Sequence, residues 1–216
     1  MHTSLLHRVA LVGLLTMASP ALAGTWVAAV AVQGSSSMLL FGINDNNIVT
    51  GAYVDSNGAQ HGFVGPFDGS AYTSFDDPDG TTEPRALDDK TDITGFDTAT
   101  LVPWERFPDR TLAVVTKDGN PLNQIAQGLN KNRYFAGNYL DKNVVSVAYV
   151  GKKAEYRSNI SLSIQNSGVA ARAVNNSGLV GGWYYDNNFV QHGSCGLAAV
   201  RPLSTTLRPL TRLWKG

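Results

Sequence analysis

The sequence predicts an all-β protein, a small β-propeller-like repeat domain of about four four-stranded blades. The first observation is a recurring phrase of a small residue, an apolar residue and Asn or Asp. Its four copies are Gly42-Ile43-Asn44, Ala86-Leu87-Asp88, Gly128-Leu129-Asn130 and Ala173-Val174-Asn175. The second is a glycine eight residues after each apolar member, namely Gly51, Gly95, Gly137 and Gly182. Their spacing of 44, 42 and 45 residues is typical of stacked or radial repeat architectures.

The first repeat shows the expected order of elements. The apolar residues 38–43 predict a strand, and the Asn- and Asp-rich residues 44–47 predict a turn, because such side chains bond the local backbone. β-Branched and aromatic residues over 48–54 predict a second strand, and 60–64 and 71–75 a third and a fourth. Each recurring glycine falls within a second strand, which indicates a β-bulge or a close approach of backbone between neighbouring units. An irregular β-sandwich and an open β repeat array are the alternative architectures.

Residues 1–23 are predicted to be a secretory signal peptide cleaved near Ala23-Gly24, so we expect a secreted or periplasmic protein. Residues 24–216 then form one domain, with units at approximately 39–83, 84–125, 126–169 and 170–216. The apolar residues 26–32 are placed to add a strand to the last unit and to close the ring. Closure of this kind removes exposed sheet edges.

The composition excludes two classes of partner. After removal of the signal peptide, 16 basic residues stand against 17 acidic ones, so no overall charge attracts nucleic acid or anionic lipid. No later stretch is long and apolar enough to span a membrane.

The single cysteine, Cys195, cannot form an internal disulfide, and we expect it to be buried in a strand. We expect a monomer that needs no cofactor.

The second unit contains the candidate binding residues Trp104, Arg106 and Phe107. They lie in residues 101–108, an insertion-like stretch with two prolines. An exposed aromatic residue with flanking charges, in a loop on a rigid scaffold, is typical of a binding site. The alternative is that the Trp104 side chain folds back over the edge of its blade.

Asp76, Asp77 and Asp79 are a candidate calcium site, because Ca²⁺ prefers oxygen ligands. The cluster lacks the distal glutamate of a full calcium loop, and turn chemistry accounts for it more simply. His61 and His192 stand at equivalent positions, each within Gln-His-Gly. Equivalent positions belong to different blades, so we expect two structural imidazoles and not a metal pair.

The first unit resembles the HAF-type probable bacterial extracellular repeat family. The residues that carry the resemblance are Gly42 to Asp45, Ile48 to Gly51, Tyr53 to Gly58, His61 to Phe63, and Phe75 with Pro78. The fourth unit matches less well, and the second and third keep only the skeleton of the motif. The resemblance implies export and a propeller-like repeat fold, and it brings no catalytic residues.

Three functions remain open. The first is an exported, non-enzymatic binding or interaction protein whose ligand is an unknown protein or glycan. The second is a secreted hydrolase acting on glycans, which requires a pocket with converging Asp, Glu or His side chains. The third is a structural component of an envelope or matrix that associates with itself.

Overall fold

The computed structural model describes residues 31–77, 80–122, 125–160 and 168–197 of the 216-residue chain. The expected signal peptide, most of the expected closing strand and Asp79 lie outside the described residues. Within the described part all the regular secondary structure is β-strand, so the all-β prediction is confirmed. None of these residues forms a helix that could cross a membrane.

The strands form four sheets that follow one another along the chain. The first contains β1 (Ser37–Ile43), β2 (Ile48–Val54), β3 (Gln60–Pro66) and β4 (Thr73–Phe75). The second contains β5 (Thr82–Leu87), β6 (Ile93–Asp97), β7 (Pro103–Arg106) and β8 (Leu112–Val114). The third has the order β10-β9-β14-β13-β12-β11, and the fourth has the order β15-β16-β17.

The third and fourth sheets depart from the expected four strands. The third contains β9 (Thr116–Lys117), β10 (Asn120–Pro121), β11 (Ala126–Leu129), β12 (Tyr134–Leu140), β13 (Ser146–Lys152) and β14 (Glu155–Ile160). The fourth contains β15 (Gly168–Val174), β16 (Leu179–Tyr185) and β17 (Gln191–Leu197). The hairpin β9–β10 lies in the range expected for unit two, yet β9 pairs in parallel with β14 of unit three. Below, units one to four are these four sheets.

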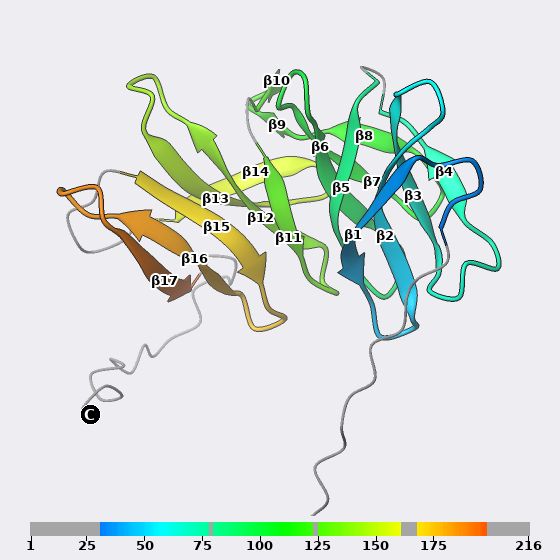
Figure 1. Cartoon of the computed structure of the whole chain (residues 1–216). Coiled ribbons are helices and arrows are strands. Elements are labelled where there is room, and N and C mark those ends of the chain that lie inside the picture. Colours follow the sequence, from blue (N-terminus) through cyan, green and yellow to red (C-terminus); the bar gives the residue numbers. More distant parts are fainter. Residues whose placement is uncertain (1–30, 78–79, 123–124, 161–167, 198–216) are drawn as a thin grey trace, which may run out of the picture.

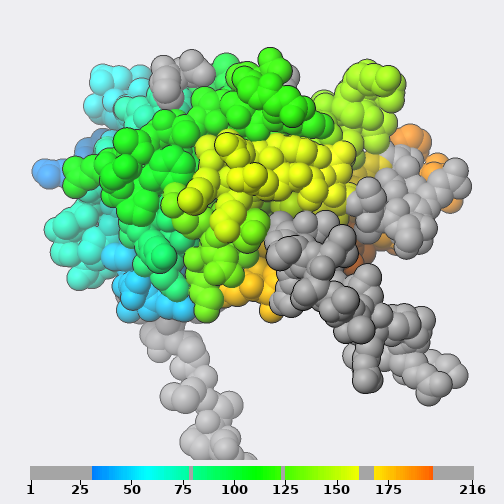
Figure 2. Space-filling view, turned by 180° about the vertical axis from the view of Figure 1, so that it is seen from behind, coloured from blue at the N-terminus to red at the C-terminus, as the bar shows by residue number. Residues whose placement is uncertain are grey.

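The sheets pack in a row in chain order (Figure 1). The first strand of each unit lies against the sheet of the preceding unit: β5 contacts β1, β2 and β3, β11 contacts β5 and β6, and β15 contacts β11, β12 and β13. Units one and four stand at opposite ends of the row in both Figure 1 and Figure 2. The described residues therefore form an open row of sheets.

Each recurring glycine faces a β-bulge in the first strand of its own unit. In unit one, Gly51 pairs with Leu40 whereas Thr50 pairs with Gly42, so Phe41 is the extra residue. The same register shift occurs in the other three units. A Cβ atom on Gly51, Gly95, Gly137 or Gly182 would lie closer than 3.0 Å to a backbone carbonyl oxygen. Only glycine fits there, because the bulge brings that carbonyl group inward.

Close approach between units occurs at a different small residue, the first of the recurring phrase. A Cβ atom on Gly42 would lie 2.8 Å from Cδ2 of Leu87, and one on Gly128 would lie 2.7 Å from Cα of Ala173. The first strands of neighbouring units therefore pack almost backbone to backbone.

The third residue of the phrase organises a turn in every unit. The side-chain oxygens of Asn44, Asp88, Asn130 and Asn175 accept hydrogen bonds from the backbone N–H groups two and four residues later, at 2.8–3.0 Å. Asn44 also donates from Nδ2 to the carbonyl oxygen of Asp88 at 3.0 Å, and Asn130 does so to Asn175 at 2.8 Å. These bonds link unit one to two and unit three to four. Asp88 has no side-chain N–H group with which to link unit two to three.

Candidate functional site

The predicted binding residues do not form an exposed loop. Pro103–Arg106 is strand β7, in which the exposed fraction of Trp104 is 1% and that of Arg106 is 4%. The exposure expected of Trp104 is therefore wrong. The alternative is right that the side chain folds back, but the indole lies over Gly95 on the face of the sheet and not over its edge. Phe107, directly after the strand, is half-buried.

Trp104 and Arg106 hold unit two against unit one. The Trp104 ring lies over Gly95, and it meets the Phe75 ring of β4 edge to face, with the ring centres 5.8 Å apart. The Arg106 guanidinium carbon lies 4.8 Å from the centre of the same Phe75 ring. These contacts explain the burial of both side chains, because the cation and the indole enclose one aromatic ring between the units.

The contact between units two and three, called the second junction here, departs from the repeat. Two positions that carry apolar or aromatic side chains in units one and three carry acids in unit two. Asp92 lies three residues before the recurring glycine of unit two, and the equivalent residues of units one and three are Ile48 and Tyr134. Glu105 pairs with the residue just before that glycine, and in units one and three the residues in this pairing are Val64 and Val150. The exposed fraction of Asp92 is 1%, and that of Glu105 is 0%. A buried charge is costly unless it is paired, so this change calls for a partner.

Arg133 of unit three supplies that partner. Its Nη2 atom lies 2.7 Å from Oδ1 of Asp92 and 3.6 Å from Oε1 of Glu105. The other Glu105 oxygen, Oε2, accepts a hydrogen bond from the backbone N–H of Ala154 at 2.5 Å. Arg133 stands in the turn that Asn130 organises, with a φ angle of 63°. The second junction is therefore closed by an ion-pair network, where the first and third are closed by apolar clusters.

Burial makes both acids weaker than usual. Burial raises the pKa of Glu105 to about 7, against the lowering effect of the Ala154 N–H group and of Arg133. Burial and the neighbouring Asp88 carboxylate raise the pKa of Asp92 to about 6. The carboxyl groups of Glu105 and Asp92 therefore gain or lose a proton near neutral pH.

A surface cavity of about 440 Å³ lies beside this network. It is lined by Phe107, Pro108, Asp109, Arg133 and Lys153. The Arg133 guanidinium carbon lies 4.8 Å from the centre of the Phe107 ring, so one side chain belongs to both the network and the cavity. Figure 2 shows the face on which the green segments of unit two border the yellow segments of β13 and β14. Phe107 is thus the one predicted binding residue that lines a cavity.

The cavity offers one aromatic ring, two cations and one carboxylate. Asp92 and Glu105 are not among its lining residues, because Arg133 stands between them and the cavity. Retaining and inverting glycosidases both need two carboxyl groups that flank the scissile bond. Among the lining residues of this cavity, Asp109 supplies one such group.

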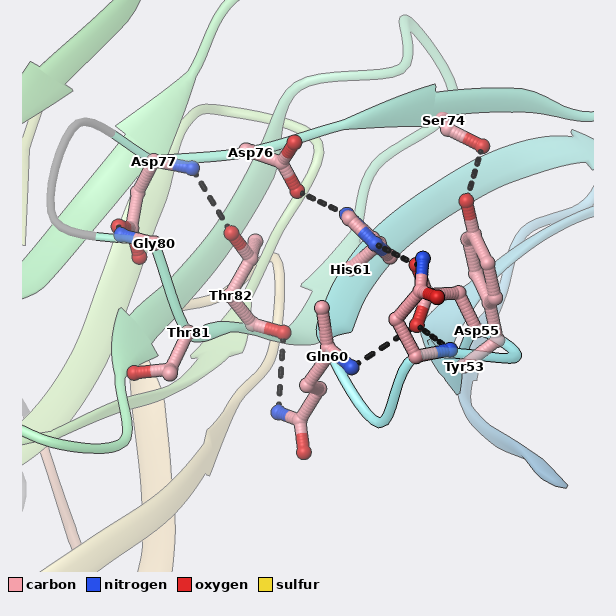
Figure 3. A network of polar contacts seen from close by, with 12 residues as sticks. Tyr53, Asp55, Gln60, His61, Ser74, Asp76, Asp77, Gly80, Thr81 and Thr82 are labelled. Carbon is pink, nitrogen blue, oxygen red and sulfur yellow. Dashed lines mark hydrogen bonds and ion pairs between the residues drawn. The ribbon is translucent and has the colours of Figure 1, made fainter. Parts of the chain in front are cut away.

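A second polar network holds the outer edge of unit one (Figure 3). The His61 ring lies between two carboxylates, with Nδ1 2.8 Å from Oδ1 of Asp76 and Nε2 3.5 Å from Oδ2 of Asp55. Asp76 is the main cause that raises the pKa of His61. Gln60 extends the network to unit two, because its Nε2 donates to the carbonyl oxygen of Thr82 at 3.1 Å.

The candidate calcium residues take part in this network and in a turn. Asp76 binds His61, as given above, and Oδ1 of Asp77 accepts the backbone N–H of Gly80 at 2.8 Å. Asp79 lies outside the described residues. In the part of the chain that the structure describes, no three or more His, Cys, Asp or Glu side chains are grouped so as to hold a metal ion.

The equivalent histidine of unit four makes a simpler pair. His192 Nε2 lies 3.0 Å from Oδ2 of Asp186, and its ring stacks on Tyr184 with centres 5.0 Å apart. His61 and Tyr53 repeat this ring contact at 5.1 Å in unit one. Both imidazoles therefore fix a turn of their own unit.

Cys195 is exposed in β17, which corrects the expectation that it is buried.

The sequence does not predict the role of four residues at the second junction, namely Asp92, Glu105, Arg133 and Lys153. A signal for two of them was present, since Asp92 and Glu105 interrupt positions that are apolar or aromatic in units one and three. No signal in the sequence places Arg133 and Lys153 beside them, because both belong to a different unit.

Comparison with protein-family models gives no match for this chain, and no curated protein matches it.

Proposed function

We propose that this chain is an exported, non-enzymatic binding protein whose ligand occupies the cavity at the second junction. One observation carries the proposal: the repeat is interrupted by acids and an arginine at the junction where a cavity opens. The acid–arginine network has displaced the apolar contacts that close the other junctions. Such a change gives up apolar burial, and the place of Arg133 in the cavity wall, against the Phe107 ring, accounts for it.

The ligand that fits the lining is an acidic glycan. The Phe107 ring provides a flat apolar surface, and Lys153 is exposed at the tip of the β13–β14 hairpin. In the described residues Lys153 makes no ion pair, whereas the charge of Arg133 is balanced by Asp92. A carboxylate on a sugar ring would therefore meet Lys153 while the ring lies on Phe107.

We also propose that the four units are propeller-like blades and that the chain belongs with the HAF-type extracellular repeats. The face-to-face packing of successive sheets, the side-by-side first strands and the bulge shared by all four units support the blade interpretation. The motif residues of unit one support the family interpretation. Export is supported by the amino-terminal 23 residues, and the mass of the protein recovered from the periplasm or medium tests it, with Gly24 expected as the first residue.

Binding is tested with purified protein and oligogalacturonate, an acidic oligosaccharide, with cello-oligosaccharide as the neutral counterpart. Lys153→Asn removes the cation and keeps a residue that tolerates the φ angle of 54° found there. Phe107→Ser removes the ring. Lys142→Asn, in the turn between β12 and β13, is the matched control.

In isothermal titration the wild type and Lys142→Asn are expected to bind the acidic glycan, with an affinity that falls as salt is added. Lys153→Asn and Phe107→Ser are each expected to lose about tenfold or more in affinity, about 1.4 kcal/mol. Binding that is equal in all four proteins contradicts the site, and absence of binding to either glycan contradicts the ligand class.

A further inference from the structure

The end of the row formed by unit one exposes an apolar side chain whose equivalents in units two and four are buried. Ile43 is the middle residue of the recurring phrase in unit one, and its exposed fraction is 61%. Its equivalents Leu87 and Val174 are both 7% exposed, because each packs into the preceding unit. Leu40 beside it is 41% exposed. Ile43 and Leu40 line an apolar cavity of about 230 Å³, here called the front face, with Phe41, Gly42, Val49 and Phe67.

The rear of the row shows the complementary surface. In unit one, the surface on which Leu87 of the next unit packs includes Ile48 and Val64, and Thr50 pairs with Val64. The residues at the same strand positions in unit four are Leu179, Gly181 and Cys195. Leu179 is 36% exposed, and Cys195 is exposed. A Cβ atom on Gly181 or on Gly193 would have nothing within 4 Å. These four residues of unit four are called the rear face.

A polar contact of the repeat also lacks its partner at the rear. Asn44 and Asn130 donate from Nδ2 to a backbone carbonyl oxygen of the next unit. Asn175 holds the same turn in unit four. Among the described residues its Nδ2 atom donates no hydrogen bond.

We propose that the front face of one chain packs on the rear face of a second copy, in the way that consecutive units pack within the chain. The proposed interface repeats a contact that occurs twice within the chain, between units one and two and between units three and four. Leu87 shares a buried cluster with Val64, and Val174 shares one with Val150. In the same geometry Ile43 of one copy meets Cys195 of the other, and Asn175 Nδ2 donates to the carbonyl oxygen of Asn44.

The occupant is a second copy because the two faces of one chain lie at opposite ends of the row (Figures 1 and 2). A contact between two different surfaces is heterologous, so it extends into a chain of molecules unless the rotation closes a ring. This assembly is an alternative to the expected monomer. The assembly does not involve the cavity at the second junction, so its tests are independent of the tests of glycan binding.

The first test is the mass of the full mature protein, measured by light scattering over a series of concentrations. Ile43→Asp places a charge in the front face, and Val144→Asp, at a turn residue that is 74% exposed in unit three, is the matched control. The wild type and the control are expected to show a mass that at least doubles with concentration. Ile43→Asp is expected to remain at the mass of one chain with an unchanged melting temperature. A wild type that stays at one chain mass overturns the proposal.

Mixing two variants tests whether the faces are complementary. Leu179→Asp blocks the rear face and leaves the front face intact, whereas Ile43→Asp does the reverse. Each is expected to be monomeric alone, and an equimolar mixture is expected to form a dimer and nothing larger. A mixture that remains monomeric overturns the pairing of these two faces.

Disulfide cross-linking separates a second copy from closure within one chain. Ile43→Cys adds one thiol to a protein whose natural cysteine, Cys195, is exposed on the rear face. Mild oxidation is expected to give dimers and longer species on non-reducing gels, and Val144→Cys is expected to give far less product. A cross-link confined to single chains would show ring closure and overturn the proposal, as would the absence of any cross-link.

Discussion

Glu105→Gln tests the buried acid at the second junction through the pH dependence of stability. The glutamine carbonyl can still accept the Ala154 N–H bond, while the titrating proton is removed. In the folded protein the pKa of Glu105 is about 7, against an ordinary value of 4.5. Between these values the folded protein holds a proton that the unfolded chain releases, so the stability of the wild type falls as the pH rises.

The magnitude follows from the pKa displacement. Each pKa unit corresponds to about 1.4 kcal/mol, so Glu105 accounts for about 3 kcal/mol in total and about 2–3 kcal/mol between pH 5 and pH 8. Asp92, with a pKa of about 6, changes stability in the same direction. The Glu105→Gln protein should therefore lose about 2–3 kcal/mol less than the wild type over this range.

Urea unfolding at pH 5 and pH 8 measures both free energies. Glu155→Gln, at a side chain that is 61% exposed, is the control and should leave the pH dependence of the wild type unchanged. Equal pH dependence in the wild type and Glu105→Gln would refute the reasoning. It would mean that the Glu105 carboxyl is solvated or fully ionised by Arg133.

Three further predictions concern the contacts between and within units. Trp104→Ala should lower the free energy of unfolding by about 3–5 kcal/mol, the usual cost of emptying a large buried aromatic site, and denaturant unfolding measures it. Asn130→Asp removes the donor to the Asn175 carbonyl oxygen and should cost about 1–2 kcal/mol in the same assay. Because Asp76 raises the pKa of His61, the stabilising pair is fully present below pH 6.5 and is lost as the pH rises through the folded value. His61→Gln should therefore lower the melting temperature more at pH 5.5 than at pH 8.5, and an equal loss at both would contradict the pairing.

The strands of unit one and the turn after the first strand of each unit could be predicted from sequence because their causes are local. Asn44, Asp88, Asn130 and Asn175 bond backbone groups only two and four residues away. The bulge could also be predicted, since a glycine inside a strand often marks a bulge or a close approach of backbone. The other alternative for these glycines, a close approach between units, occurs instead at the small first residue of the phrase, Gly42 or Gly128.

The candidate site could be predicted only in part because its members come from different units. The charged and proline-rich surroundings of Trp104 leave open whether its ring is exposed or folded back, and the ring packs on Phe75, which lies in another sheet. Phe107 was singled out and does line a cavity. Its neighbours Arg133 and Lys153 follow it by 26 and 46 residues, and only the packing of unit three on unit two brings them together.

The central claim is that four stretches of this chain form the same β unit, each built around a bulge that only glycine allows. The most direct measurement is the free energy of unfolding of four single variants, Gly51→Val, Gly95→Val, Gly137→Val and Gly182→Val. All four should be destabilised by several kcal/mol, because each Cβ atom would meet a carbonyl group. Gly196→Ala, where a Cβ atom would make only an ordinary contact of 3.9 Å with Cγ2 of Ile160, should leave the free energy nearly unchanged. Stability close to the wild type in any of the four valine variants would contradict the claim.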